Sequence, residues 1–230
     1  MLELYIGNKN YSSWSMRPWL VLKHFKISFK ECLIHFDDNQ SKEILKQTFK
    51  QTMSRISPTK KVPVLIQDDF VIWDSLAICE YLAEQYPHLQ LWPMDSKQRA
   101  YARALCAEMH SGFQTLRQLC VMNIEADLAE IGQKLWLEHP QLQEDVQRIE
   151  AIWAKRLQQD QYLFEHDFSI ADAFFAPIVM RLISYQLPVS EHTKIYMQQI
   201  LTIPAVQQWI TEAKAEKRFI QSLEPYRQST

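Results

Sequence analysis

The chain has 230 residues, of which 47% are hydrophobic and 23% are charged, and its formal net charge is −2. This length and composition are typical of a globular protein with a sizeable core, in one or two domains. The charge is nearly balanced and no basic cluster stands out, so we expect no nucleic-acid partner. No apolar stretch reaches the roughly 18 residues that cross a bilayer, and no signal peptide is predicted, so we expect no membrane association.

The cysteines and histidines point to neither disulfides nor a metal. The four cysteines are well separated and form no Cys-x-x-Cys pair, which is typical of reduced core thiols in a cytosolic protein. The seven histidines are scattered, without the spacing of metal ligands. We therefore expect a cytoplasmic protein without a metal site.

Hydrophobic spacing predicts alternating strands and helices up to Pro87. The predicted order is strand, helix, strand, helix, strand, strand, helix. A helix between the first two strands implies a parallel pair, whereas the hairpin around Asp68 and Asp69 adds antiparallel strands. This order is that of a thioredoxin-like α/β domain. The expected elements cover residues 2–6, 18–25, 29–36, 41–53, 64–67, 71–73 and 76–86.

From Asp95 onward the pattern is helical throughout. Ser96 is expected to cap a long helix that runs to about Asn123, and Ser169 and Asp172 have the spacing of a capping box. Further helices are expected over residues 124–138, 142–160, 169–185, 191–201 and 205–216. We therefore predict an α/β domain of residues 1–87, a linker of residues 88–94 and an all-α domain of residues 95–230.

Pro63 stands inside a run that otherwise predicts a buried strand. Because proline cannot donate to a strand ladder, it is expected at the start of a strand, at an edge or at a bulge. We predict a cis Val62–Pro63 bond, which turns the chain and leaves the N–H and C=O of Val62 free. An extended, peptide-like ligand can pair with such a free backbone.

Asp74 and Ser75 lie between an apolar run and a helical pattern. Acidic and hydroxyl side chains at such a junction cap the helix, and exposed N–H groups there favour a carboxylate ligand. A plain helix cap is the simpler alternative.

A cluster of hydroxyls, Ser12, Ser13 and Ser15, precedes the first predicted helix. The free N–H groups and the dipole at a helix start favour negative charge, so a thiolate held there would be stabilised. One charge-assisted hydrogen bond of about 1.5–3 kcal/mol lowers a thiol pKa by about one to two units. Helix capping alone is the alternative. Pro18 fits a helix only within its first turn.

Together, these motifs resemble the glutathione site of the glutathione transferases. The resemblance implies that Val62, before the cis Pro63, pairs with the cysteinyl backbone of glutathione. It also implies that Asp74 and Ser75 hold the γ-glutamyl carboxylate and that Lys61 reaches the glycyl carboxylate.

The serine cluster is similar to the zeta-class signature Ser-Ser-Cys followed two residues later by arginine. Ser12, Ser13 and Arg17 match it, which places Ser12 first as the serine that activates the thiol and Ser13 close behind. Trp14 stands where zeta enzymes carry cysteine. This departure disfavours isomerase activity of the maleylacetoacetate type, and also redox chemistry of the omega or glutaredoxin type.

In this family the helix after the linker faces the active site. Gly112 lies within it, where glycine costs about 1 kcal/mol relative to alanine, which suggests a close approach of ligand or backbone. Packing or a dimer face is an alternative role for the side chains of this helix. The residues expected to line the electrophile pocket are Trp14, Met109, His110, Ser111, Phe113 and Arg117.

The sequence thus predicts a cytoplasmic, homodimeric glutathione transferase of zeta- or theta-like serine type, with a thioredoxin-like domain and an all-α domain. It would use glutathione as co-substrate, without metal, and conjugate it to a small apolar electrophile in detoxification. The alternatives are a glutathione-dependent isomerase and a non-catalytic binding or regulatory protein that keeps the fold.

Overall fold

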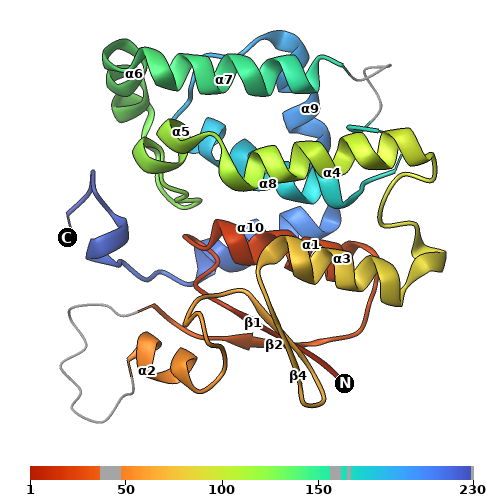
Figure 1. The fold of residues 1–230 in the computed structure, drawn as a ribbon. Coiled ribbons are helices and arrows are strands. Elements are labelled where there is room, and N and C mark those ends of the chain that lie inside the picture. Colours follow the sequence, from red (N-terminus) through yellow and green to blue (C-terminus); the bar gives the residue numbers. More distant parts are fainter. Residues whose placement is uncertain (37–47, 156–161, 165–166, 229–230) are drawn as a thin grey trace.

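In the computed structural model, a small sheet carries the N-terminal part of the chain and helices form the rest (Figure 1). The structure describes residues 1–36, 48–155, 162–164 and 167–228. No helix within these ranges has both the length and the apolar character needed to cross a membrane.

The sheet has the strand order β2-β1-β3-β4. The first pair is parallel and the other two pairs are antiparallel, as the sequence predicts. The core side of β1 is buried through Leu2, Leu4 and Ile6. The strands are β1 (Leu2–Ile6), β2 (Lys30–Leu33), β3 (Val64–Gln67) and β4 (Phe70–Trp73).

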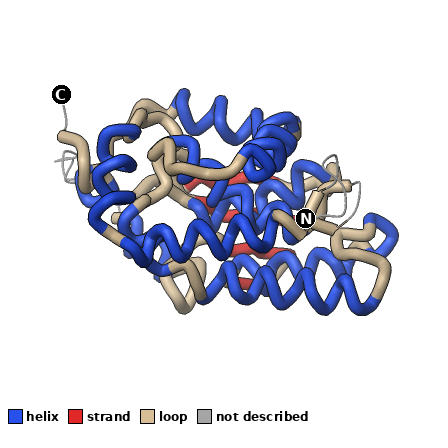
Figure 2. Tube along the Cα trace, turned by 90° about the horizontal axis from the view of Figure 1, so that it is seen from above, coloured by secondary structure: helices blue, strands red, loops and turns tan. Residues whose placement is uncertain are grey.

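Two helices of the N-terminal part, α1 (Ser13–His24) and α3 (Ser75–Gln85), lie between the sheet and the remaining helices, and Figure 2 shows helices covering the strands. The helix expected over residues 41–53 is described as α2 (Phe49–Ser54), and residues 41–47 lie outside the described ranges. The prediction for Pro18 is wrong, because it lies five residues after Ser13, beyond the first turn. Lacking an N–H, it gives α1 no hydrogen bond to the Trp14 carbonyl.

The helical part follows a short 3-10 turn, Pro87–Leu89, and a connection to α4. Helix α8 is buried along almost its whole length and contacts α1, α4 and α9. Helix α10 returns to the N-terminal part and packs on α1. The helices are α4 (Ser96–Ser111), α5 (Gln114–Leu119), α6 (Ala129–Glu138), α7 (Pro140–Trp153), α8 (Ile170–Ser184), α9 (Glu191–Thr202) and α10 (Pro204–Ala215).

The long helix predicted from Ser96 to Asn123 is broken. Gly112 ends α4, and Phe113 takes a left-handed backbone conformation, φ 53°, before α5 begins. Asp95, and not Ser96, caps α4, because its carboxylate accepts the N–H groups two and three residues later. The next helix begins at Ala129 instead of residue 124, and α7 ends at Trp153, while residues 156–160 lie outside the described ranges.

The predicted capping box at the start of α8 is confirmed. Asp172 Oδ2 accepts the backbone N–H of Ser169 at 3.0 Å and its hydroxyl at 2.8 Å. Its Oδ1 accepts the N–H of Leu163 at 3.0 Å and the hydroxyl of Tyr196 at 2.9 Å. The buried carboxylate therefore ties the start of α8 to a neighbouring loop and to α9.

The C-terminal segment packs against the loop between β1 and α1. Lys9 is buried between the rings of Trp19 and Trp209 and pairs with Glu31 and Glu212. Further along, the Tyr11 hydroxyl donates to Glu224 at 2.6 Å. The loop between β1 and α1 is thus fixed at Lys9 by α10 and at Tyr11 by the residues that follow α10.

Candidate active site

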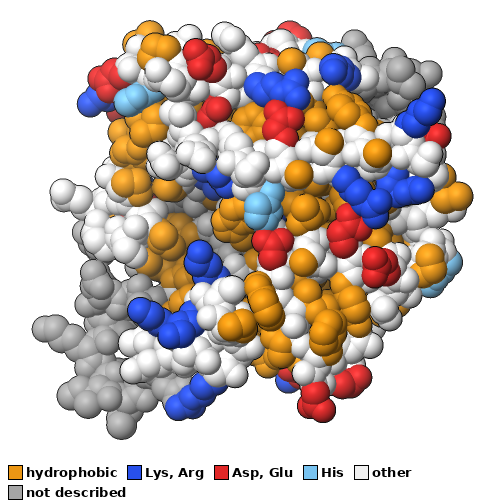
Figure 3. Space-filling model, in the orientation of Figure 1, with side chains coloured by type: hydrophobic (Ala, Val, Ile, Leu, Met, Phe, Trp, Pro, Cys, Tyr) orange, Lys and Arg blue, Asp and Glu red, His pale blue; other side chains and the backbone are white. Residues whose placement is uncertain are grey.

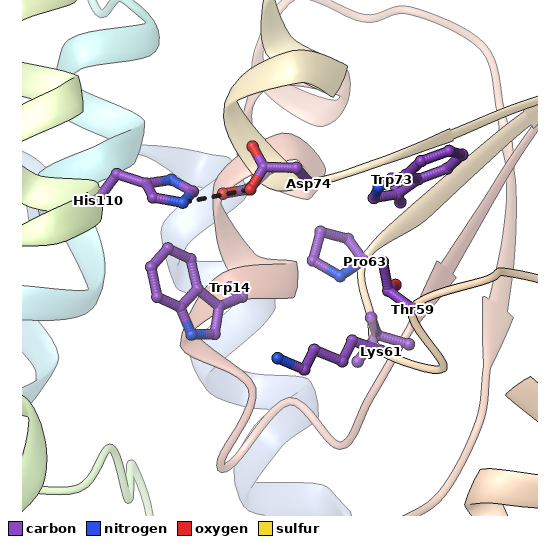
Figure 4. A pocket seen from close by; sticks show the side chains of 9 residues that line it. Trp14, Thr59, Lys61, Pro63, Trp73, Asp74 and His110 are labelled. Atoms are coloured by element: carbon purple, nitrogen blue, oxygen red, sulfur yellow. Dashed lines mark ion pairs between the residues drawn. The ribbon is translucent and has the colours of Figure 1, made fainter.

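A cavity of about 320 Å³ lies where the sheet meets α4. Figure 4 shows His110 and Asp74 facing one another across it, with Trp14 beside them and Lys61 reaching in from the loop before β3. Its lining residues are Trp14, Thr59, Lys61, Val62, Pro63, Trp73, Asp74, Ser75 and His110. Every glutathione-site residue predicted from Lys61 to Ser75 is among them.

The Val62–Pro63 bond is cis, as predicted, and Pro63 directly precedes β3. Val62 lies in the turn and is not part of the strand ladder, which pairs Val64 with Tyr5. Among the described residues, the N–H and C=O of Val62 take part in no backbone hydrogen bond. This leaves one backbone donor and one acceptor at the edge of the cavity.

Asp74 caps α3 with a backbone φ of 78°. Its Oδ1 accepts the N–H groups of Leu76 at 2.8 Å and Ala77 at 3.2 Å. Its Oδ2 faces His110 Nε2 at 3.2 Å. The Oγ of Ser75 is buried and has no protein partner within the described chain. The junction is therefore a helix cap that also presents an unpaired hydroxyl to the cavity.

The serine cluster opens onto a second cavity, of about 410 Å³, which shares Trp14, Lys61 and Val62 with the first. Ser12 lies at the N-cap position of α1, but its side chain makes no capping hydrogen bond. The other lining residues are Tyr11, Ser12, Ser13, Phe36, Phe49, Ser222 and Leu223. The wall is mainly apolar, apart from the hydroxyls and Lys61.

The residues predicted for the electrophile pocket do not all line one cavity. Of its members, Trp14 and His110 line the first cavity. Met109 and Phe113 are buried in the core, and the exposed Ser111 donates to a carbonyl of its own helix. Arg117 donates to the His110 carbonyl at 3.1 Å. Because the helix breaks after Ser111, the residues that follow do not continue the axis of α4.

A set of cations surrounds the start of α1. The Arg17 guanidinium is buried between the rings of Trp14, at 4.1 Å, and Phe174, at 4.8 Å. Two of its nitrogens have no partner in the described chain, and burial lowers the pKa of Arg17 to about 9. Arg181 is also buried, which lowers its pKa to about 10. Both groups remain mainly charged at neutral pH, so the potential near the serines is positive.

Several site residues carry no signal in the sequence. Phe36 and Phe49 fit the apolar faces of a strand and a helix, which is how a core residue would also look. Arg181 reaches Ser13 from a helix far along the chain. Neither Trp73 nor the C-terminal pair Ser222 and Leu223 belongs to a recognisable motif. Among the described residues, no group of three His, Cys, Asp or Glu side chains is placed to hold a metal ion.

Comparison with known proteins gives consistent matches. Residues 11–85 match the family "Glutathione S-transferase, N-terminal domain". The chain is 28% identical over 192 residues to a probable maleylacetoacetate isomerase of Caenorhabditis elegans, covering 84% of each chain. It is 29% identical over 194 residues to maleylacetoacetate isomerase of Rattus norvegicus, covering 84% of this chain and 83% of that one.

Among solved structures, a glutathione transferase homolog from Burkholderia gl BGR1, with bound glutathione, superposes with a TM-score of 0.67. It is 27% identical and the match covers 93% of this chain and 98% of that one. The cis Val62–Pro63 bond and the capped start of α3 are two of the motifs on which the sequence resemblance rests. Residues 11–85 form a glutathione S-transferase N-terminal domain, and the chain as a whole is similar to glutathione transferases in sequence and fold.

Proposed function

We propose that this protein is a glutathione-dependent enzyme that conjugates the thiol of glutathione to a small apolar electrophile. The observation that carries the proposal is that the two cavities adjoin, since Trp14, Lys61 and Val62 line both. One cavity has the capped start of α3, and the other has the serine cluster. A tripeptide thiol can therefore place its carboxylate at one end and its sulfur at the other.

The contacts follow from the chemistry of each residue. The free backbone of Val62 suits the extended cysteinyl unit of glutathione. The unpaired Ser75 hydroxyl at the start of α3 suits the γ-glutamyl carboxylate, and Asp74 Oδ2 suits the adjacent ammonium. Lys61 suits the glycyl carboxylate. In this proposal residues 1–87 bind glutathione, residues 88–94 are a linker, and residues 95–230 complete the electrophile pocket.

The chemical step needs little from the protein beyond positioning and charge. The thiol S–H bond breaks, its proton leaves to water, and the electron pair stays on sulfur. A serine hydroxyl, Ser12 or Ser13, donates a hydrogen bond to the thiolate and is not itself the nucleophile. The sulfur then bonds to the electrophilic carbon, which expels a leaving group or takes up a proton. Phe36, Phe49 and Leu223 supply an apolar wall for the electrophile.

Calorimetric titration with glutathione, paired with turnover of chlorodinitrobenzene, tests the proposal. We expect saturable binding by the wild type, and turnover lost with binding kept in Ser12→Ala or Ser13→Ala. Thr211→Ala, which removes an exposed hydroxyl bonded within its own helix, is the control and should behave like the wild type. Absence of glutathione binding would overturn the proposal and favour a non-catalytic role.

A glutathione-dependent isomerase is the second candidate, because two relatives are maleylacetoacetate isomerases at 28% and 29% identity. Trp14 replaces the zeta-class cysteine and fills the wall between the cavities, so we expect no isomerisation of maleylacetoacetate by the wild type. Trp14→Cys should bring detectable isomerisation if that residue alone is missing. Isomerisation by the wild type would make this candidate the better one.

We also propose that the protein is a cytoplasmic homodimer that acts in detoxification. Hydrophobic side chains gather over the part of the surface that carries β4 (Figure 3). Phe70 is 60% exposed and Trp73 is 44% exposed, both on this edge strand. Light scattering should give a dimer for the wild type and a monomer for Phe70→Glu. A monomeric wild type would contradict the assembly.

A further inference from the structure

The two serines at the start of α1 differ in their hydrogen bonds. Ser12 Oγ donates to Ser15 Oγ at 2.7 Å, and Ser15 Oγ also accepts the N–H of Gly7 at 3.2 Å. The Ser12 proton is therefore directed into the protein. Ser13 Oγ accepts a hydrogen bond from Arg181 Nη2 at 3.2 Å. No described group accepts the Ser13 proton, so this hydroxyl can donate into the cavity that it lines.

Arg181 is held in place by a second contact. Arg181 is a buried residue of α8, and its Nη1 donates to the carbonyl of Cys120 at the end of α5. Within the described chain, no carboxylate lies at ion-pair distance from its guanidinium. Its charge is therefore left uncompensated beside Ser13, where it favours a neighbouring anion.

The Glu224 carboxylate, which is bonded to the nearby Tyr11, is paired with Arg227, and the other charged groups near this point are mainly cations. Arg17 is buried beside Trp14 and is unpaired, and the Arg117 guanidinium lies 5.6 Å from the centre of the same ring. His110 also packs on Trp14, and its partner Asp74 lies in the first cavity. Lys61 lines both cavities.

We infer that Ser13, and not Ser12, donates the hydrogen bond that stabilises the glutathione thiolate, and that Arg181 is its positioning residue. The inference rests on the proposed function. When the thiol S–H bond breaks and its proton leaves to water, the sulfur keeps the electron pair and accepts the Ser13 O–H. The guanidinium, by donating to the same oxygen, orients that O–H toward the cavity and makes it a stronger donor.

A purely structural role for Arg181 predicts a different pattern of results. Its bond to the Cys120 carbonyl joins α8 to the end of α5, and loss of that bond would lower stability without changing the acidity of a bound thiol. A role through Ser13 predicts that the acidity changes, and that it changes only while Ser13 is present. The pKa of the bound thiol therefore separates the two.

The experiment follows the thiolate absorbance of enzyme-bound glutathione as a function of pH, together with the pH profile of kcat/KM. Ser13→Ala and Arg181→Met should each raise the pKa of the bound thiol by about one to two units, a roughly ten- to hundredfold loss of thiolate at neutral pH. Arg181→Lys, which keeps the charge without the planar fork, should recover part of the loss. Ser12→Ala should raise the pKa less than Ser13→Ala.

Two further variants complete the design. The double variant Ser13→Ala with Arg181→Met should match Ser13→Ala alone, because the arginine acts through that hydroxyl. Ser184→Ala is the matched control, since Ser184 is on the same helix and loses a buried hydrogen bond to Asn123 at 2.6 Å without touching Ser13. It should lower the melting temperature and leave the thiol pKa unchanged.

The outcomes separate this inference from the proposed function. A larger rise in Ser12→Ala than in Ser13→Ala would overturn the serine assignment while the transferase function stands. Additive effects in the double variant would make Arg181 an independent or structural residue. If Arg181→Met does not fold, Arg181→Lys provides the test. The inference would be refuted if the bound thiol kept its wild-type pKa in both Arg181→Lys and Ser13→Ala. Failure of the wild type to bind glutathione would overturn both proposals.

Discussion

Arg17 contacts aromatic rings where an ion pair would be expected. Its guanidinium lies between Trp14 and Phe174, and two of its nitrogens are unpartnered in the described chain. A desolvated cation–π contact contributes about 2 kcal/mol, whereas the effective penalty for burying an ion is several kcal/mol. Arg17 is therefore a net cost to stability, one that gives the start of α1 its positive potential.

We predict that Arg17→Met raises the stability of the fold. An apolar side chain of similar length removes the desolvation penalty, so the free energy of unfolding should increase by about 1 kcal/mol or more. Chemical denaturation at neutral pH measures it. Arg148→Met, which removes an exposed ion pair with Glu108, is the control and should change stability by less than about 1 kcal/mol. A clear loss of stability in Arg17→Met would show that the buried cation has a partner.

At the level of elements, α8 depends on one carboxylate. Asp172 accepts hydrogen bonds from Ser169, Leu163 and Tyr196, and burial raises its pKa even though these donors oppose the rise. Because α8 contacts both α1 and α4, the start of this helix also sets the position of Arg181 relative to Ser13.

We predict that Asp172→Ala destabilises the protein by about 3 kcal/mol or more. The change leaves several buried donors without an acceptor, each costing about 1–3 kcal/mol. Asp127→Ala, which removes an exposed bond to the N–H of Ala129, should cost only about 1 kcal/mol. Denaturant midpoints of the two variants give the comparison. Equal midpoints would mean that water replaces the carboxylate at the start of α8.

At the level of the whole molecule, the C-terminal segment closes the structure through Glu224. This carboxylate is buried, which by itself would raise its pKa, but bonds from Arg227, Tyr11 and Asn123 outweigh burial and lower it. Glu224 is therefore more readily ionised in the folded than in the unfolded chain. Its contribution to stability is complete above its ordinary pKa of 4.5 and is lost as the pH falls below that value.

We predict that the melting temperature falls between about pH 5 and pH 3, and that it falls less steeply in Glu224→Gln. Burial would raise the pKa of Glu212, but the bond from Lys9 outweighs it and lowers the pKa. This adds to the fall of melting temperature with pH in both the wild type and Glu224→Gln. The raised pKa of Asp172 acts in the opposite direction. Glu191→Gln, at an exposed position, should keep the wild-type slope. An equally steep fall of melting temperature in Glu224→Gln and the wild type would contradict this role of Glu224.

The features that could be predicted from the sequence depend on local chemistry. The succession of strands and helices follows from hydrophobic spacing. The turn at Pro63 and the caps at Asp74 and Ser169 follow from the properties of those side chains next to their own backbone. The break after α4 was missed, because a left-handed Phe113 has no local signature and is stabilised by packing. Of the residues predicted for the electrophile pocket, Phe113 and Arg117 follow this break, so a continuous helical pattern misplaces them.

By itself, then, the sequence determined the succession of strands and helices in the N-terminal part, the cis proline and the glutathione-site residues from Lys61 to Ser75 in the first cavity. The tertiary structure alone decided what surrounds the serines. Arg181 reaches Ser13 across 168 residues, and Tyr11 reaches Glu224 across 213. Such pairs are brought together only when α8 and the C-terminal segment pack against α1. Hydrophobic burial, which is non-directional, drives that packing, so no local pattern in the chain records which polar groups will meet.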